Sequence, residues 1–235
     1  MRQWFALSAL AVALGLCAAV SNAGEEKAGP KDNMPPRGFT ALFNGKDLTG
    51  WQGLVPINKR KKDPAEYAAQ VKAATAKAVE HWKVVDGILV YDGKNNNLQS
   101  AKDYGNFELF VDWKIEPNGD SGIYLRGNPQ VQIWSINDRN NPKKVGSGGL
   151  YNNQKNPSNP LVVADNPVGQ WNTFHIKMVG DKVTVKLNDK LVVDNTPLEN
   201  YWNRKEALPA RGPIELQHHG DKLWFKNIYV KELPD

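Results

Sequence analysis

Short segments in which hydrophobic and polar residues alternate dominate the chain from residue 87 onward. They are rich in β-branched and aromatic residues, and Gly, Asn, Asp and Pro separate them. The segments are GILVYD (87–92), FELFVDWKI (107–115), GIYLR (122–126), VQIW (131–134), NTFHIKMVG (172–180), KVTVKLND (182–189), KLVVDN (190–195), PIELQH (213–218) and LWFKNIYVKEL (223–233). LNDK (187–190) sits between two of them as a tight hairpin turn would. Many antiparallel strands in one domain favour an all-β sandwich or barrel.

One segment has helical instead of alternating character. Asp63 is a suitable N-cap, Pro64 suits the first helical position, and Glu66 completes a capping-box pattern. An alanine-rich stretch follows, so we expect one helix near residues 64–81. Four of its residues share a face at helical spacing: Tyr67, Val71, Ala74 and Ala78. We interpret this helix as an insertion packed on the main body, with no catalytic residue.

The N-terminal residues have the form of a secretory signal. Arg2 precedes an apolar stretch, and the small residues Ser21 and Ala23 fit a cleavage site, which predicts a signal peptide over residues 1–23. The alternative is a membrane anchor, for which the apolar stretch is short. Cleavage would remove Cys17, the only cysteine, so we expect no disulfide-built fold. Residues 24–37 are polar and proline-rich, which indicates a flexible leader before a single domain over 38–235.

Composition and charge add little to this picture. The net charge is +5 and the lysines are scattered; the run NKRKKD (58–63) is the one basic block. A solvated loop explains that run better than nucleic-acid binding. We therefore expect no nucleic-acid partner, no membrane span after signal cleavage, and a periplasmic or extracellular location. The sequence has no phosphate-cradling glycine loop and no CxxC or HExxH motif.

Four of the expected strands combine an apolar face with a face of unusual polarity. Side chains alternate across a strand, so the polar faces carry Glu108, Phe110 and Asp112; Tyr124 and Arg126; Gln130, Gln132 and Trp134; and Glu215, Gln217 and His219. An ordinary solvated sheet face is one explanation. Amides and aromatics beside acids also suit an open groove that hydrogen-bonds hydroxyls and stacks on sugar rings. The Gly- and Asn-rich loops at 118–122 and 145–160 could place backbone groups near a ligand or simply form turns.

Two histidines fall outside this pattern. His218 alternates onto the apolar side of its strand, and His175 alternates with Phe174 and Ile176, so we expect structural roles for both.

A set of motifs in order resembles one known family. The motifs are GFTALFNGKDLTGW (38–51), FELFVDWKI (107–115), DSGIYLRG (120–127), PQVQIW (129–134), GSGGLYNN (146–153), VGQWNTFHIKMVGDKVTVKLND (168–189) and GPIELQHHGDKLWFKNIYVKEL (212–233). Together they resemble the 3-keto-disaccharide hydrolase family, also described as 3-keto-glucoside 1,2-lyase/hydratase. The resemblance implies a concanavalin A-like jelly roll of two antiparallel sheets with a sugar site on the concave face. It also implies export and an oligosaccharide or glycoside as substrate.

The resemblance has one departure that affects the site. Many family members have YEVQILD where this chain has PQVQIWS (129–135), so Gln130 and Ser135 stand where the family has Glu and Asp. A role that needs a carboxylate cannot be carried over to either position.

The implied chemistry needs a base at C2, a group that stabilises the enolate oxygen at C3, and an acid for the leaving oxygen. Glu215 and His219 are the candidate base and acid, and Arg126 is the candidate cation for the enolate. A structural ion pair of Arg126 with Glu108 or Asp112 is the equal alternative. Four residues would orient the sugar: Tyr124, Gln132, Gln217 and Trp134.

Three further alternatives stay open. A divalent metal held by Glu108, Asp112, Glu215 and His219 could polarise the keto group, although their spacing is no known metal motif. The same groove could also belong to a non-catalytic carbohydrate-binding module, with Trp134 as its stacking platform, or to an adhesion domain. No other cofactor is implied.

Overall fold

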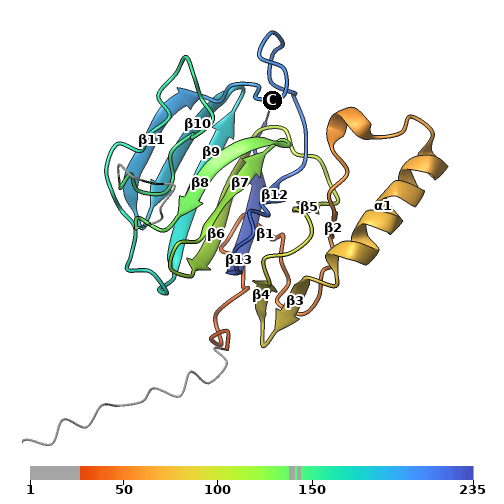
Figure 1. Ribbon diagram of the computed structural model, residues 1–235, viewed down its shortest axis with the longest axis horizontal. Helices are drawn as coiled ribbons and strands as arrows, with labels where there is room; N and C mark the ends of the chain where they lie inside the picture. Colours follow the sequence, from red (N-terminus) through yellow and green to blue (C-terminus); the bar gives the residue numbers. More distant parts are fainter. Residues whose placement is uncertain (1–26, 138–140, 142–143, 235) are drawn as a thin grey trace, which may run out of the picture.

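The computed structural model describes residues 27–137, 141 and 144–234, and the predicted signal peptide lies outside the described residues. The described residues form two antiparallel sheets, the larger with eight strands. Its main path runs through β11 (Lys190–Pro197), β10 (Lys182–Leu187), β9 (Asn172–Val179), β6 (Phe107–Ile115), β13 (Leu223–Glu232), β4 (Ile88–Tyr91) and β3 (Trp82–Val85), and β1 (Thr40–Ala41) pairs with β13. Figure 1 shows how these strands are arranged.

The second sheet has five strands. Its spatial order is β2 (Trp51–Gly53), β5 (Leu98–Ser100), β12 (Glu215–Leu216), β7 (Asp120–Leu125) and β8 (Asn128–Trp134). Each neighbouring pair in this order is antiparallel. The predicted concanavalin A-like jelly-roll sandwich is therefore confirmed. The strands at β1, β2, β3 and β5 were not expected, because each is too short to show an alternating pattern.

The core lies between the two sheets, and strand alternation decides which residues enter it. On β6, the core side chains Phe107, Leu109, Val111 and Trp113 are all fully or almost fully buried. Ile123 on β7 and Leu216 on β12 come from the other sheet into the same cluster. The side chains between these residues must then point outward, one set on each side of the sandwich.

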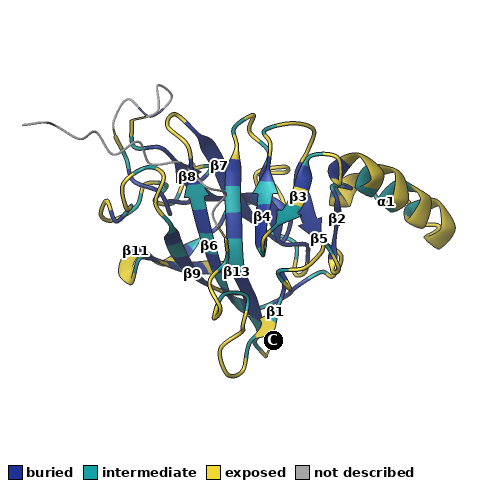
Figure 2. Ribbon diagram, turned by 90° about the horizontal axis from the view of Figure 1, so that it is seen from below, coloured by how far each residue is buried: buried dark blue, intermediate teal, exposed yellow. Residues whose placement is uncertain are grey.

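The predicted helix exists and is slightly shorter than expected. Helix α1 spans Pro64–Ala78, and the Asp63 carboxylate caps it by accepting a hydrogen bond from the Glu66 backbone N–H at 2.9 Å. It ends before residue 81 because the chain turns there into β3, whose first residue Trp82 is fully buried. Figures 1 and 2 show α1 beside β2 at the end of the sandwich away from β11, with most of its surface exposed.

The close contact between α1 and β2 depends on a glycine. A Cβ atom at Gly53 would lie 2.2 Å from the Ala74 carbonyl oxygen, so any larger residue would push the helix off the strand. Because α1 covers β2, it leaves the outer face of β5, β12, β7 and β8 free for the cleft described below.

Two local predictions can be compared with the structure. Asn188 and Asp189 join β10 to β11 with φ of 49° and 65°, as a type I′ hairpin turn requires, so the predicted turn is confirmed. The expected leader is fixed near residue 32, where the Asp32 carboxylate accepts hydrogen bonds from Lys226 Nζ at 2.8 Å and Asn227 Nδ2 at 2.9 Å. Within the described part of the chain, no helix is both long and apolar enough to cross a membrane.

Candidate active site

The outer face of the five-stranded sheet carries a row of polar side chains. Strand register places Gln52, Gln99, Glu215 and Tyr124 opposite one another on β2, β5, β12 and β7. Side chains directly opposite on neighbouring strands lie about 5 Å apart at Cβ. Buried polarity of this extent on one sheet face is unusual, and two members of the row, Glu215 and Tyr124, line a cleft.

One part of the cleft, here called the polar compartment, has a volume of about 590 Å³. It contains six of the residues predicted from the sequence: Tyr124, Gln130, Gln132, Trp134, Gln217 and His219. Asp120 and the aromatic ring of Tyr151 complete its walls, and Tyr151 lies edge-on to Trp134 with ring centroids 5.1 Å apart. Residues from β7, β8 and the segment after β12 therefore meet as the alternation predicted.

A chain of hydrogen bonds crosses the floor of the polar compartment. Gln130 Nε2 donates to Gln132 Oε1, and Gln132 Nε2 donates to Asp120 Oδ1 at 2.6 Å. The other carboxylate oxygen, Asp120 Oδ2, lies 3.5 Å from His219 Nδ1. The His219 side chain is 49% exposed, so its ring is held on one side and open to the cleft on the other.

A second part of the cleft, here called the Glu215 compartment, has a volume of about 700 Å³. Tyr124 and Trp202 line both compartments, so they mark the junction between the two. Glu215 is 3% exposed, and its Oε2 accepts a hydrogen bond from Asn97 Nδ2 at 2.8 Å. Burial raises the pKa of the Glu215 carboxyl to about 7, against the smaller opposing effects of Asn97 and the Arg60 charge.

Tyr124 and Gln217 lie at the junction of the two compartments. Gln217 Nε2 donates a hydrogen bond to the Tyr124 hydroxyl at 3.3 Å. Burial, and secondarily the nearby Glu215 charge, raises the pKa of Tyr124, so its hydroxyl keeps its proton. Gln217 Oε1 is buried and has no hydrogen-bond partner among the described residues.

The prediction that Glu108 and Asp112 share this face is wrong. Both lie on β6, which belongs to the eight-stranded sheet, so they point out of the opposite side of the sandwich. Glu108 Oε2 lies 3.2 Å from His175 Nε2, and Asp112 accepts hydrogen bonds from Thr173 Oγ1 at 2.6 Å and Asn227 Nδ2 at 2.6 Å. Alternation gives the face of each strand, but it does not tell which sheet the strand joins.

The prediction that Arg126 faces the cleft is also wrong, for a local reason. Arg126 and Gly127 form the two-residue turn between β7 and β8, with φ of 55° and 71°, so strand alternation does not apply to Arg126. Its buried guanidinium donates to the Gly105 carbonyl at 2.8 Å, the Pro209 carbonyl at 3.3 Å and Asn106 Oδ1 at 3.1 Å. These bonds tie three loops together.

His218 and His175, for which structural roles were expected, both lie away from the cleft. His218 Nδ1 is hydrogen-bonded to the hydroxyl of the core residue Tyr91, and burial lowers the pKa of His218. His175 stacks on Phe110 with ring centroids 4.3 Å apart. Neither lines the cleft compartments described above.

The four residues considered for a metal do not come together, since Glu108 and Asp112 lie on the other sheet from Glu215 and His219. Across residues 27–137, 141 and 144–234, no group of three or more His, Cys, Asp or Glu side chains could hold a metal ion. The hypothesis that these four residues together bind one metal ion is therefore wrong.

Several residues of the cleft were missed by the sequence analysis. Asp120 alternates with Ser121 in line with Tyr124, so strand alternation could have found it. Asn97 directly precedes β5, whose three residues are too few to show an alternating pattern. Trp202 lies in a loop, where no periodic signal exists.

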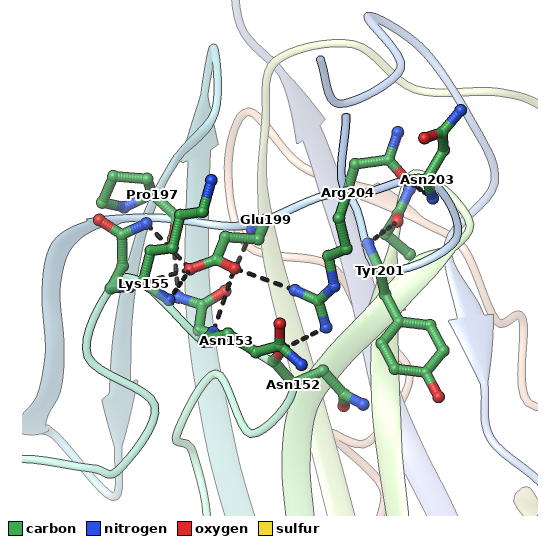
Figure 3. Close-up of polar contacts among 12 residues, drawn as sticks. Asn152, Asn153, Lys155, Pro197, Glu199, Tyr201, Asn203 and Arg204 are labelled. Atoms are coloured by element: carbon green, nitrogen blue, oxygen red, sulfur yellow. Dashed lines mark hydrogen bonds and ion pairs between the residues drawn. The ribbon is translucent and has the colours of Figure 1, made fainter. Parts of the chain in front are cut away.

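The loop that carries Trp202 is held by a half-buried ionic clasp. Glu199 accepts hydrogen bonds from the backbone N–H groups of Gln154, Lys155 and Asn156 at 2.7–3.1 Å, and from Arg204 Nη1 at 2.9 Å. Figure 3 shows Glu199 between Lys155 and Arg204, with Tyr201 on the same loop. These bonds lower the pKa of Glu199 to about 2, against the effect of burial. The clasp fixes one wall of the cleft.

The fold and the cleft together define a β-sandwich protein with a polar, aromatic-lined groove of the kind that binds sugars. A family model described as "3-keto-alpha-glucoside-1,2-lyase-like domain" matches residues 38–231, and the chain belongs to this family. A protein of *Bacteroides thetaiotaomicron* named 3-keto-disaccharide hydrolase is 25% identical over 251 residues, covering 83% of this chain and 79% of that protein.

Solved structures agree on the fold. Two crystal structures from Parabacteroides distasonis, each described as a proposed glycosyl hydrolase, are similar to this chain. One has a TM-score of 0.63 at 24% identity and covers 87% of this chain and 100% of its own. The other has a TM-score of 0.62 at 26% identity and covers 84% of this chain and 85% of its own.

Proposed function

We propose that this protein is an enzyme that cleaves 3-keto-glucosides by removing the C2 proton, eliminating the C1 substituent and adding water, with net hydrolysis. Family membership supports the substrate class, and the relative named 3-keto-disaccharide hydrolase supports the reaction. The observation that carries the proposal is one sheet face with two titratable groups in different settings. His219 is open to the cleft and paired with Asp120, and Glu215 is buried with a pKa of about 7.

The reaction balances without an external oxidant or reductant. The C3 carbonyl makes the C2–H bond acidic, and a base takes that proton while its electron pair forms an enolate. The enolate electrons then form the C1–C2 double bond, which breaks the C1–O bond. The leaving aglycone oxygen takes a proton from an acid. Water adds across the C1–C2 double bond to complete hydrolysis. This route differs from that of ordinary glycosidases, which place two carboxylates around the anomeric carbon.

His219 is the base in this proposal. When its Nδ1–H is directed at Asp120, the neutral ring has its lone pair on Nε2, on the side open to the cleft. The Asp120 carboxylate also stabilises the protonated ring that forms when the C2 proton is taken. Gln132 holds Asp120 from the other side, so the orientation of the pair is fixed before the substrate binds.

Glu215 is the acid in this proposal. A carboxyl with a pKa of about 7 is substantially protonated at neutral pH, and it loses its proton readily to an alkoxide. Its hydrogen bond from Asn97 holds one oxygen, and Glu215 lies next to the junction marked by Tyr124. We place the scissile bond at this junction.

The remaining cleft residues bind and orient the keto sugar. The Tyr124 hydroxyl keeps its proton and replaces Arg126 as the donor to the enolate oxygen at C3. Gln130 and Gln217 offer amides to the sugar hydroxyls, and Trp134 offers an aromatic wall. We also propose that the protein is exported to the periplasm or the cell exterior, since residues 1–23 have the form of a signal peptide.

The first experiment measures aglycone release from 3-keto-glucosides and from the matching unoxidised glucosides, with and without EDTA. Release from the keto sugars alone supports the proposal, and loss of release with EDTA would add a metal that the proposal does not contain. If no substrate releases its aglycone while calorimetry detects sugar binding, the protein is a carbohydrate-binding module instead of an enzyme.

Substrates with different leaving groups distinguish the base role of His219 from the acid role of Glu215. His219→Gln should lower kcat/KM about 10²–10⁴-fold for every aglycone, because C2–H cleavage always needs the base. Glu215→Gln should lower kcat/KM strongly for an aglycone that leaves as an alkoxide. It should lower kcat/KM only slightly for nitrophenolate, which leaves without a proton. His175→Gln and Glu108→Gln are matched controls, since that pair lies on the other sheet. Equal losses by Glu215→Gln on both aglycones would contradict the acid role.

A further inference from the structure

The two compartments of the cleft differ in what they offer a ligand, and this difference carries an inference that rests on the proposed function. The polar compartment presents amides, a carboxylate and an imidazole beside aromatic rings that include Trp134, Tyr151 and the shared Trp202, a combination suited to a sugar ring. Beside Glu215, the other compartment presents several apolar side chains: Leu54, Pro56, Ile57, Pro209 and the Trp202 ring. A substrate that spans the junction would place its two halves in different chemical surroundings.

Polar residues also line the Glu215 compartment, among them the exposed charged residues Lys59 and Glu206, and the cleft's own walls engage amide groups of three of its asparagines. Asn97 donates to Glu215 and accepts from the His218 backbone N–H. Asn200 donates to the Ala207 carbonyl and accepts from the Asn203 backbone N–H. Asn128 Oδ1 accepts from the Tyr201 backbone N–H. Amides engaged in this way have less hydrogen bonding to offer a ligand, which leaves the apolar side chains as the contrast with the polar compartment.

Trp202 is exposed and yet fixed in position. It is 61% exposed, and its indole N–H donates to the Gly127 carbonyl at 2.7 Å. Tyr201 packs edge-on against it with ring centroids 4.8 Å apart, and the Glu199–Arg204 clasp holds the loop on the C-terminal side. A large aromatic ring held rigidly beside a cavity binds a flat partner at a low cost in conformational entropy.

Gly127 keeps the Glu215 compartment open. Its φ is 71°, and a Cβ atom there would lie 2.9 Å from Ile57 Cδ1 and 3.4 Å from Glu215 Oε1. Ile57 is itself 37% exposed, although it is a large hydrophobic residue. The compartment's volume of about 700 Å³ lies within the range of pockets that enclose a drug-sized molecule.

We infer that the Glu215 compartment is the subsite for the leaving group, and that it takes a flat apolar or aryl-bearing aglycone in preference to a second sugar. The keto-glucose ring lies in the polar compartment and the aglycone extends past Tyr124 toward Ile57 and Trp202. The glycosidic oxygen then passes next to Glu215, which supplies its proton.

The test compares two 3-keto-glucosides, one with a benzyl aglycone and one with a glucosyl aglycone. Both leave as alkoxides, so the demand on the acid is similar and the aglycone contacts decide the difference. Trp202→Ala should lower kcat/KM for the benzyl substrate about tenfold, mainly through KM, and change the glucosyl substrate little. Ile57→Ala should act in the same direction. Trp224→Ala removes a tryptophan from the eight-stranded sheet and should change neither substrate.

The outcomes separate this inference from the proposed function. If the wild type cleaves both substrates and Trp202→Ala lowers both equally, or the glucosyl substrate more, the inference is wrong and the proposed function stands. If the wild type cleaves neither, the proposed function fails. Calorimetry of the two ligands with the wild type and Trp202→Ala then decides the inference: selective loss of benzyl binding supports it, and equal loss or no loss overturns it.

Discussion

Replacement of Glu215 by glutamine tests whether the buried carboxyl has the pKa that an acid at neutral pH needs. The substitution keeps the shape of the side chain, and its amide oxygen can still accept the hydrogen bond from Asn97 that now spans 2.8 Å. It removes only the ionisation. The difference in unfolding free energy between wild type and variant, followed against pH, therefore reports the titration of this one group.

The sign and the size follow from the raised pKa. Glu215 titrates at about 7 in the folded state and near 4.5 in the unfolded chain, so between these values the folded state holds one proton more. Wild-type stability is then full below pH 4.5 and decreases as pH rises through 7. A shift of this size corresponds to about 3 kcal/mol between the two ends of the window. The unfolding free energy of Glu215→Gln should not show this decrease. Above pH 7 the variant should therefore be more stable than the wild type by about that amount.

Urea unfolding of both proteins at closely spaced pH values from 4 to 9 measures this difference. Glu116→Gln, which changes an exposed carboxyl after β6, is the control and should follow the wild-type curve closely. The reasoning would be refuted if the difference in unfolding free energy between wild type and Glu215→Gln stayed constant from pH 5 to 8. The carboxyl would then be ionised in the cleft throughout that range. In the intact enzyme, kcat/KM for alkoxide aglycones should fall as pH rises above 7.

Three further predictions concern the packing around the cleft. Arg126→Ala should lower stability by about 2–4 kcal/mol in urea unfolding, since the loops at residues 105–106 and 209 lose their shared donor, and leave the kcat/KM of folded protein unchanged; a fall in kcat/KM alone would restore an enolate role. Gly122→Val should raise KM about tenfold, because a Cβ atom there lies 2.8 Å from Gln130 Cδ, and unchanged kinetics would contradict this packing. Glu199→Gln should destabilise near neutral pH, and the deficit should shrink as pH falls from 4.5 toward 2; a pH-independent deficit in thermal melts would exclude a carboxylate held by the N–H groups of residues 154–156.

Strand alternation predicted the sandwich and much of the cleft from sequence. The outward residues of β8 and β12, such as Gln132 and Glu215, lie on the same face because both strands belong to the same sheet. The rule is local and physical: successive side chains of a strand point to opposite faces, and the core takes one of them. Asp120 obeys the same rule and was missed only because its segment looked like a loop.

The errors came from information that alternation does not contain. Asp112 lies on a strand with the expected pattern, but that strand pairs with β9 and β13 and so faces the other side of the molecule. Sheet membership is decided by pairing between distant parts of the chain. Arg126 failed for another reason, since a two-residue hairpin turn begins there and a turn residue has no strand face. Trp202 comes from a loop held by Glu199, and only the folded structure brings it to the cleft.

The cost of burying Glu215 favours an enzyme over a binding module. A glutamine at this position would accept the same hydrogen bond from Asn97. It would also spare the folded protein the loss of about 3 kcal/mol in unfolding free energy that the ionising carboxyl causes above pH 7. A module that only binds hydroxyl groups gains nothing from such a carboxyl, because an amide serves equally as an acceptor. A catalyst gains a proton that is available at neutral pH beside the bond to be broken. The pairing of His219 with Asp120 in the adjoining compartment gives the second half of the same chemistry.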